Sequence, residues 1–256
     1  MTHIIAVASE KGGVGKTTIA TNLLAWLALR CGKDTIIVDL DSQGNATQSV
    51  EIDNPALVAG NGTHQLLDGT ASLADVALRI DDRRRIVGSH VGLAALEPTL
   101  HDPSKTFTLK NALHGADADF IVVDCPPSLG PLTYNGLAAA THVIMPLRPD
   151  YYSISAANSI TRTIEMVKKK DNPDLAVLGF VLNEMPTSPM TRLATDVKRE
   201  LNKLFGSRGL FGRWIRAAVR FQEAASRRKS VFEFGPSKAL NSFSSFAWEV
   251  KKRGRF

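Results

Sequence analysis

The sequence predicts an α/β fold: a doubly wound, mostly parallel sheet flanked by helices on both faces. Three observations lead to this prediction. Short apolar runs alternate with segments of helical periodicity along most of the chain. A glycine-rich loop lies directly between the first apolar run and the first helical pattern. Two later apolar runs end in aspartate, at the point where strands of open α/β sheets carry their ligand sites.

Strands are expected wherever a short apolar run is bounded by turn residues or by a helical pattern. The expected strands are His3–Ala8, Thr35–Leu40, Val91–Leu96, Phe120–Cys125, His142–Leu147, Ala176–Asn183 and Leu210–Ile215. Parallel neighbours need a crossover connection, and the helical segments between these runs supply it. The sheet is therefore expected to be mostly parallel.

Helices are expected between the strands, and several of them open on a Ser or Thr that can cap the first turn. They are Thr17–Arg30, Leu73–Ile80, Ser104–His114, Ser153–Lys169, Thr191–Phe205 and Pro236–Lys252, with loops expected at Asp53–Gly62 and Pro186–Pro189. A single domain, residues 1–256, accounts for the chain, because 256 residues with 44% hydrophobic content can bury one sizeable core.

The composition excludes several classes of protein. No apolar run reaches about 18 residues and no secretory leader precedes the first strand, so a cytoplasmic protein is expected. Cys31 and Cys125 are too few for a disulfide framework or a four-thiolate metal site. The six histidines lack metal-ligand spacing.

Residues 10–18, Glu-Lys-Gly-Gly-Val-Gly-Lys-Thr-Thr, are expected to form a phosphate-binding loop, called the phosphate loop below. The general pattern G-x-x-x-x-G-K-[ST] requires glycine where this chain has Glu10, and Lys11 adds a second lysine. The chemical groups remain: glycine N–H groups for phosphate oxygens, Lys16 for the β- and γ-phosphates, and the Thr17 hydroxyl for Mg²⁺. The alternative is a glycine-rich turn that binds nothing, but the flanking strand and helix favour the phosphate loop.

Carboxylates follow two of the expected strands. Asp39 and Asp41 are two residues apart, and residues i and i+2 of an extended chain face the same side. Four apolar residues end in Asp124, which is typical of a carboxylate that organises Mg²⁺ in nucleotide hydrolases. Such a strand end is otherwise a simple strand cap, and the phosphate loop in the same chain favours the magnesium role.

Charge is distributed unevenly along the chain. Residues 192–256 hold sixteen Lys and Arg against five Asp and Glu, whereas the net charge of the whole chain is only +6. A basic C-terminal quarter on an acidic body indicates a polyanion partner, either nucleic acid or an anionic membrane surface. Solvated helix faces are the alternative explanation.

These motifs together resemble the ParA/Soj group of the ParA/MinD family of P-loop ATPases, whose phosphate loop is a deviant Walker A motif. The resemblance rests on KGGVGKTT, VDLDSQGNAT, VVDCPPSLG and RAAVRFQEA, and it spans nearly the whole chain. It implies ATP and Mg²⁺ as cofactors and an ATPase that is slow without a partner. Two residues depart from the family: Ser42, where proline is common, and Glu10, where a neutral polar residue is usual.

The resemblance also implies site residues. The ATP-binding set is Lys11, Gly12, Gly13, Val14, Gly15, Lys16, Thr17, Thr18 and Asn183. Lys11 would reach across an ATP-bound sandwich dimer to the partner's phosphates and stabilise the charge that develops there. Asn183 would contact the base, or would simply be a turn residue that closes its strand.

The acidic residues complete the implied site. Asp41 would orient the attacking water and, with Lys11 and Lys16, forms the catalytic set. Asp39 would support the magnesium-side network and Asp124 would hold Mg²⁺ through water, so the metal set is Thr17, Asp39 and Asp124.

By resemblance, ATP joins two subunits into a homodimer that binds nonspecific double-stranded DNA on the nucleoid, and a ParB-like or other adaptor triggers hydrolysis. This cycle would segregate or position a cargo such as a plasmid, a chromosome or an organelle. The residues expected to contact DNA are Arg216, Arg220, Arg227, Arg228 and Lys252, with Lys229, Lys251 and Arg253 widening the patch. Arg216 and Arg220 have the spacing of one helical turn.

Two alternatives remain. A MinD-like ATPase that cycles on a membrane would use a terminal helix with Phe243, Phe246, Ala247 and Val250 on one face, although packing of this face on the body is favoured. A small-molecule or electron-transfer ATPase is the other alternative. Cys125 beside Asp124 is expected to be a small packed residue rather than a nucleophile, because no cationic partner for it is visible in the sequence.

Overall fold

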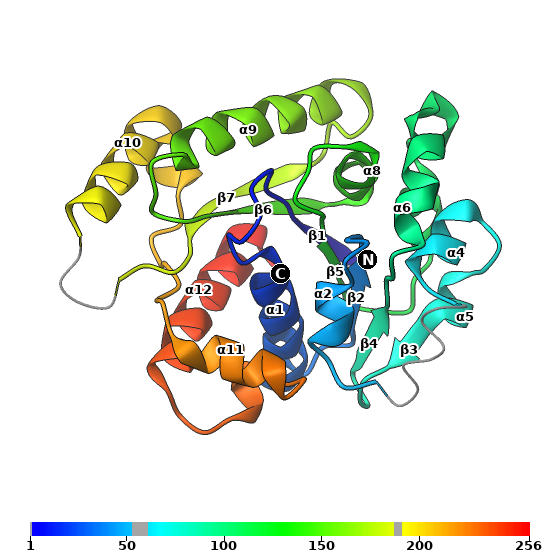
Figure 1. Cartoon of the computed structure of the whole chain (residues 1–256), viewed down its shortest axis with the longest axis horizontal. Helices are drawn as coiled ribbons and strands as arrows, with labels where there is room; N and C mark the ends of the chain where they lie inside the picture. Colours follow the sequence, from blue (N-terminus) through cyan, green and yellow to red (C-terminus); the bar gives the residue numbers. More distant parts are fainter. Residues whose placement is uncertain (1, 53–60, 187–190) are drawn as a thin grey trace.

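The computed structural model describes residues 2–52, 61–186 and 191–256, and a seven-stranded sheet runs through its centre (Figure 1). The strands are β1 (His3–Val7), β2 (Thr35–Asp39), β3 (Ala77–Arg79), β4 (Arg84–Val87), β5 (Phe120–Asp124), β6 (His142–Leu147) and β7 (Ala176–Leu182). Their order is β3-β4-β2-β5-β1-β6-β7, and every pair is parallel except β3 with β4. The predicted doubly wound, mostly parallel sheet is confirmed.

Helices cover both faces of the sheet (Figure 1). They are α1 (Lys16–Cys31), α2 (Asn45–Gln48), α4 (Thr63–Asp68), α5 (Leu73–Val76), α6 (Leu93–Leu96), α7 (Thr108–Ala112), α8 (Pro131–Ala139), α9 (Ser153–Lys170), α10 (Arg192–Gly209), α11 (Val219–Ser226) and α12 (Lys238–Gly254), with short 3-10 turns η1 (Glu97–His101), η2 (Pro103–Lys105) and η3 (Val231–Glu233). One apolar core joins the sheet to α1 and α12. The other joins it to α8, α9 and α10.

Helix α1 begins directly at the phosphate loop and is buried along most of its length, with Trp26 only 1% exposed. Its ends are set by Gly15 and Gly32, whose φ angles of 87° and 66° are in the left-handed region that favours glycine. Since β1 is flanked by β5 and β6, this helix starts at the middle of the sheet's carboxyl edge.

Two strand predictions were wrong. Val91–Leu96 contains the helix α6, and the strand that pairs with β2 is β4, which begins with Arg84 and Arg85. The charged pair interrupts the apolar pattern. Arg84 is nevertheless buried because its guanidinium binds both Glu233, at 3.0 Å, and Asp81, at 2.7 Å.

Leu210–Ile215 runs beside β7 without forming a strand. The N–H groups of Phe211 and Ile215, near its two ends, donate to the carbonyl groups of Phe180 and Leu182 at 2.8 and 2.9 Å. The reason lies in the middle of the segment. The Glu249 carboxylate accepts hydrogen bonds from the backbone N–H groups of Gly212 and Arg213, at 2.9 and 2.8 Å, so these groups are not available to a strand ladder.

The helix predictions were correct for the long helices and too generous for the short ones. Leu73–Ile80 is helical only to Val76 and continues as β3, while Ser104–His114 is divided between η2 and α7. The helices α2, α4, α8 and α11 were missed. Residues 53–60 and 187–190 of the two expected loops lie outside the described residues.

The expected packing of the last helix is confirmed. Phe243, Phe246, Ala247 and Val250 are all fully buried on the body, so this face of α12 is not available to a lipid surface. Over the described ranges, no helix combines the length and the apolar character that crossing a membrane requires.

Candidate nucleotide site and basic surface

The phosphate loop depends on glycine at two positions with left-handed backbone, Gly13 at φ 71° and Gly15 at φ 87°. Gly15 also lacks space, because a Cβ there would lie 2.1 Å from Asn183 Nδ2. That amide donates a hydrogen bond to the Val14 carbonyl, at 2.9 Å, from the residue that follows β7. Asn183 therefore braces the phosphate loop through its contact with Val14, a role that turn preferences alone did not indicate.

Lys16 is the buried cation of the loop, with 7% of its surface exposed. Its Nζ donates to the Lys11 carbonyl at 3.0 Å. Burial lowers the pKa of Lys16, and the nearby charges of Asp124 and Asp41 partly oppose this effect. A desolvated ammonium at a helix N-terminus favours an anionic ligand.

Thr17 and Asp124 form the candidate metal site. The Thr17 hydroxyl donates to Asp124 Oδ2 at 2.7 Å, and Asp124 Oδ1 is buried without a hydrogen-bond partner among the described residues. Burial, followed by the charge of Asp39, holds the pKa of Asp124 well above its ordinary value. An unsatisfied carboxylate oxygen beside a hydroxyl fits Mg²⁺, which prefers oxygen ligands and neutralises such a charge.

Asp39 organises the loop that follows β2. Its carboxylate accepts hydrogen bonds from the Asp41 N–H, at 3.1 Å, and from the N–H and hydroxyl of Thr47, at 2.9 and 2.8 Å. Burial raises the pKa of Asp39 to about 6 despite these hydrogen bonds. Both of its oxygens are thus already bonded, which supports a network role for Asp39 rather than direct metal binding.

Asp41 lies at the same edge of the sheet as Lys16, and the residue is 8% exposed. Oδ1 accepts from the Gln43 N–H at 3.0 Å, so Oδ2 is the oxygen left for a ligand or a water. Gly44 then turns the chain with φ 63°, in the left-handed region. A Cβ at this position would lie 2.8 Å from the Ser89 carbonyl oxygen, so the turn requires glycine. The turn fixes the direction in which Asp41 is presented.

Lys11 is the exception within the loop, because its side chain leaves the phosphate site. Its ammonium pairs with the carboxylate of Asp150, in the loop after β6, and lies 5.4 Å from the centre of the Tyr152 ring. The Lys11 and Asp150 side chains are each about one third exposed. Sequence reasoning missed Asp150, although its place at a strand end on the ligand edge was a usable signal.

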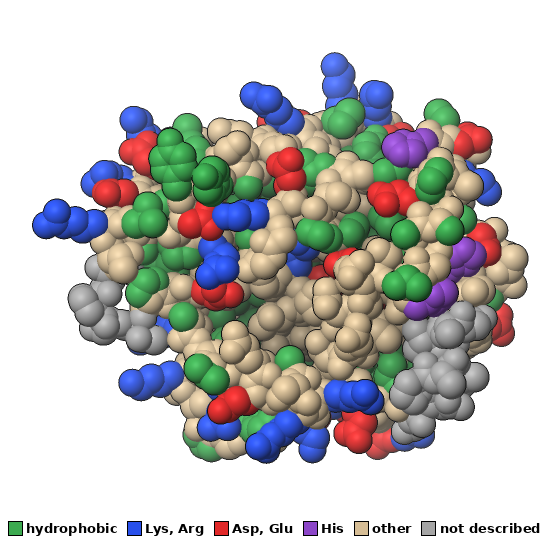
Figure 2. All heavy atoms as spheres, in the orientation of Figure 1, with side chains coloured by type: hydrophobic (Ala, Val, Ile, Leu, Met, Phe, Trp, Pro, Cys, Tyr) green, Lys and Arg blue, Asp and Glu red, His purple; other side chains and the backbone are tan. Residues whose placement is uncertain are grey.

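A cavity of about 350 Å³ adjoins the loop and is large enough for a nucleoside. It is lined by Thr18, Asn183, Glu184, Arg216, Ala217, Ala218, Val219, Phe221, Gln222 and Ala225. We call it the nucleoside cavity. Thr18 and Asn183, both in the predicted ATP-binding set, line this one cavity, and residues of α11, which the sequence did not predict, form another part of its wall. Figure 2 shows a hollow near the centre of this face, over the first turn of α1.

Cys125 is packed, 1% exposed, against the sheet. Burial is the main reason why the pKa of its thiol lies far above the ordinary range, with the Asp124 charge acting in the same direction. A thiol that stays protonated is a poor nucleophile.

Known proteins are similar to this chain in sequence and in fold. A family model described as an AAA domain matches residues 2–177. The chromosome-partitioning ATPase Soj of Thermus thermophilus is 36% identical over 255 residues, which cover 97% of this chain and 95% of that protein. The chain belongs to the ParA/Soj family of ATPases. The sporulation initiation inhibitor protein Soj of Bacillus subtilis is 33% identical and is covered completely, with 99% of this chain aligned. The predicted family and the predicted ATPase class are confirmed.

Solved structures place this ParA/Soj-type ATPase in the same fold. The cobyrinic acid a,c-diamide synthase of Mycobacterium smegmatis, with ADP and magnesium, matches with a TM-score of 0.82 and 30% identity over 96% of this chain and 93% of that one. An ATP complex of Cyanothece McdA matches with a TM-score of 0.87 over 98% and 96% of the two chains, and at 17% identity it shows the fold alone.

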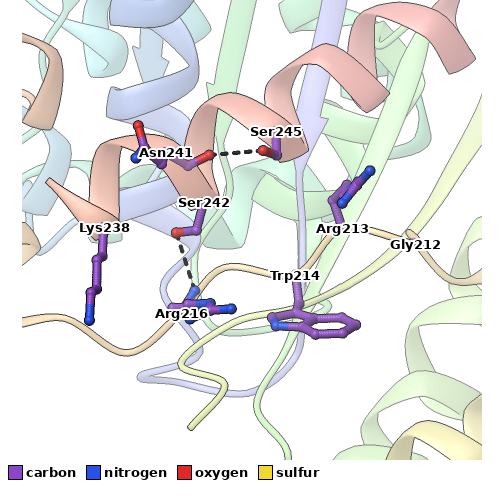
Figure 3. A pocket seen from close by; sticks show the side chains of 8 residues that line it. All are labelled: Gly212, Arg213, Trp214, Arg216, Lys238, Asn241, Ser242 and Ser245. Carbon is purple, nitrogen blue, oxygen red and sulfur yellow. Dashed lines mark hydrogen bonds between the residues drawn. The ribbon is translucent and has the colours of Figure 1, made fainter. Parts of the chain in front are cut away.

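The basic residues that were predicted to contact DNA in this ParA/Soj-type ATPase lie in two different places. Arg216 and Lys252 line two adjoining cavities, of about 350 and 1040 Å³, which share Arg213 and Ser245. We call these cavities the basic groove. Its further cationic lining residues are Lys238, Arg208, Arg253 and Arg255. Figure 3 shows the first cavity, with Lys238, Asn241, Ser242 and Ser245 on α12 and the remaining side chains on the segment that follows α10.

The other predicted DNA contacts lie on or beyond α11. Arg220 pairs with Glu223 at 3.3 Å, and both Arg220 and Arg227 lie over the Phe234 ring, at 5.5 and 5.6 Å. Arg228 lines a separate cavity that also holds Glu233. The expected helical turn from Arg216 to Arg220 is wrong, because α11 begins only at Val219.

Proposed function

We propose that this chain is a partition or positioning ATPase that dimerises around two ATP·Mg²⁺, binds nonspecific double-stranded DNA in that state, and hydrolyses ATP slowly until an adaptor of the ParB type stimulates it. Residues 1–256 act as one unit that works on the nucleoid. The observation that carries this proposal is the position of Lys11. This lysine belongs to the phosphate loop, yet its ammonium is paired with Asp150 and its side chain is about one third exposed. The proposal is that the nucleotide of a second subunit takes the place of Asp150.

Each residue of the site has a role in this proposal. Lys16 and the loop N–H groups bind the phosphates, while Thr17 and Asp124 hold Mg²⁺, which neutralises phosphate charge. Asp41 orients the attacking water through its Oδ2, since Oδ1 is already bonded to the Gln43 N–H. Lys11 of the opposite subunit stabilises the charge that develops on the transferred phosphoryl group.

The basic groove is the proposed DNA interface. Arg213, Arg216, Lys238 and Lys252 are exposed along one continuous depression, and Asn241, Ser242 and Ser245 add polar groups beside them. Lys and Arg contacts to phosphates give affinity without sequence preference, and the affinity falls as salt rises. A dimer doubles the groove, so nucleotide controls the affinity for DNA.

The test is retention of a long DNA duplex by the protein with ATP and with ADP, at increasing salt. We expect strong retention with ATP, weak retention with ADP, and a steep loss as salt rises. Binding to DNA that is equally strong without nucleotide, or that is insensitive to salt, would contradict the proposal. Sedimentation with anionic liposomes and ATP tests the MinD-like alternative, which requires lipid binding in the absence of DNA binding.

A small-molecule synthase is the second candidate, because a solved structure at 30% identity is named as one. The two functions differ in what stimulates ATP hydrolysis. A partition or positioning ATPase is stimulated by DNA together with its adaptor, whereas a synthase consumes ATP only with its small-molecule substrate.

A further inference from the structure

Arg216 lies in the wall between two cavities. On one side it lines the nucleoside cavity with Thr18 and Asn183. On the other side it lines the basic groove with Arg213 and Lys238 (Figure 3). Arg216 is the residue that these two sets of lining residues have in common.

Hydrogen bonds tie the backbone of Arg216 to both sites. Asn183, which braces the phosphate loop, is followed two residues later by Met185. The Met185 N–H donates to the Ile215 carbonyl at 3.0 Å, and the Met185 carbonyl accepts from the Ala217 N–H at 2.9 Å. The Arg216 N–H then contacts Ser242 Oγ of α12 at 3.5 Å. The backbone is thus held between the phosphate loop and the basic groove.

The side chain of Arg216 is less constrained than its backbone. It is exposed, and within residues 2–52, 61–186 and 191–256 no carboxylate is within ion-pairing distance of it. Arg253, in contrast, pairs with Glu249 and donates to three carbonyl groups. An unpaired arginine side chain retains most of its rotamer freedom, and ordering it on a phosphate costs free energy.

We propose that nucleotide in the nucleoside cavity confines the Arg216 side chain to the basic groove, so that nucleotide and DNA phosphate strengthen each other's binding within one subunit. This inference rests on the proposed function. The physical reason is that the nucleoside occupies space otherwise open to the guanidinium. Part of the rotamer entropy that the Arg216 side chain loses on contact with a DNA phosphate is then lost when the nucleotide binds. DNA binding therefore costs less free energy. The coupling precedes dimerisation and adds to it.

The test uses ADP, which fills the nucleoside cavity without supplying a γ-phosphate. The affinity for a short duplex of about one helical turn is measured by fluorescence anisotropy with and without ADP at low salt. We expect ADP to lower the Kd about fivefold, which is at the lower end of coupling between two sites. Since such coupling is reciprocal, the same duplex must tighten the binding of a fluorescent ADP by the same factor.

Two variants distinguish coupling from a general loss of charge. Arg216→Met keeps the bulk of the side chain and should abolish the ADP effect in both titrations. Arg213→Met is the matched control, because Arg213 lines only the groove. Arg213→Met should weaken DNA binding and leave unchanged the ratio of the Kd without ADP to the Kd with ADP. Thermal melting of both variants checks that they fold.

Three results would overturn the inference: no ADP effect in the wild type, an ADP effect that survives in Arg216→Met, or one that disappears equally in Arg213→Met. The long-duplex experiment with ATP separates this failure from failure of the proposed function. If ATP-dependent retention is present while ADP has no effect on the short duplex, only the inference fails. If the wild type retains no DNA with ATP, the proposed function itself fails.

Discussion

Lys11 and Asp150 form an ion pair between the phosphate loop and the loop after β6, although 139 residues separate them. The pair is partly exposed, and such pairs contribute about 1 kcal/mol or less to stability. Burial alone would raise the pKa of Asp150, but hydrogen bonds from Lys11 and Ser153 hold it below its ordinary value. The carboxylate is therefore ionised at neutral pH, and a phosphate can compete with it for Lys11.

Asp150→Asn should favour the ATP-bound dimer, because it frees Lys11 for the partner's nucleotide. A pair that is about one third exposed contributes roughly 1 kcal/mol, or about fivefold in an equilibrium constant. Because one such pair is released in each subunit, we expect the dimer to form at about 25-fold lower protein concentration. Analytical ultracentrifugation with a slowly hydrolysed ATP analogue measures this. Asp82→Asn removes a pair with Arg79 that is far more exposed to solvent, so this variant is the control and should change nothing. A weaker dimer in Asp150→Asn would show that Asp150 supports the interface instead.

Asp41→Ala should retain ATP and DNA binding and lose hydrolysis. The expected loss is about 100-fold or more in the ATPase rate, the range for removing a group that positions or deprotonates a nucleophile. Phosphate release is measured with DNA and adaptor present. Gln43→Ala is the matched control, because Gln43 contacts Asp41 only through its backbone N–H. Normal hydrolysis by Asp41→Ala would refute the water-positioning role.

The buried carboxylate of Asp39 predicts that the stability of the nucleotide-free protein depends on pH in an unusual direction. The pKa of Asp39 is about 6 in the folded chain and 3.8 in a model compound. Between about pH 4 and 6 the folded state therefore binds more protons than the unfolded state, so this group's contribution to the unfolding free energy falls as pH rises. Denaturant unfolding without Mg²⁺ and nucleotide should show this slope, and saturating ATP·Mg²⁺ should reduce it. A rise of stability through this window that is unchanged in Asp39→Asn would contradict the assignment.

Asp124→Asn should stabilise the nucleotide-free protein at neutral pH and remove its response to Mg²⁺. Burial raises the pKa of Asp124, so its charge disfavours the folded chain, and the neutral amide removes that charge. Thermal melting measures both effects, with ATP alone and with ATP·Mg²⁺. A variant that still gains stability from Mg²⁺ would place the metal elsewhere.

Charge reversal at Arg213 and Lys238 should abolish DNA binding and preserve ATP-driven dimerisation. Each phosphate contact that is lost also lowers the slope of affinity against salt by about 1. Reversal of Arg227 and Arg228, which lie outside the groove, is the control and should have a smaller effect. If the control loses DNA binding and the groove variant does not, the DNA interface lies at the end of α11.

Local patterns predicted the phosphate loop, the acidic strand ends and the parallel sheet, because each depends on residues close together in the sequence. What the sequence did not reveal depends on distant partners. Strand β4 was missed since Arg84 is neutralised by Glu233, 149 residues away. Asp150 was missed because its importance comes from Lys11. The basic residues were grouped by their charge. Charge alone does not show that Arg220 is paired with Glu223, whereas Arg216 has no carboxylate partner in the part of the chain that the structure describes.

Arg253 lines the basic groove, but its guanidinium has a structural role that affects how the DNA interface can be mapped by mutation. Its guanidinium fastens α12 to the carbonyl groups of Leu178, Arg208 and Leu210, at 2.7, 2.7 and 2.8 Å. An alanine scan of the basic quarter would therefore identify Arg253 for the wrong reason, since its loss would deform the wall of the groove without removing a phosphate contact. The salt dependence distinguishes the two cases. A residue that fastens the wall lowers the affinity at every salt concentration alike, whereas a phosphate contact also changes the slope.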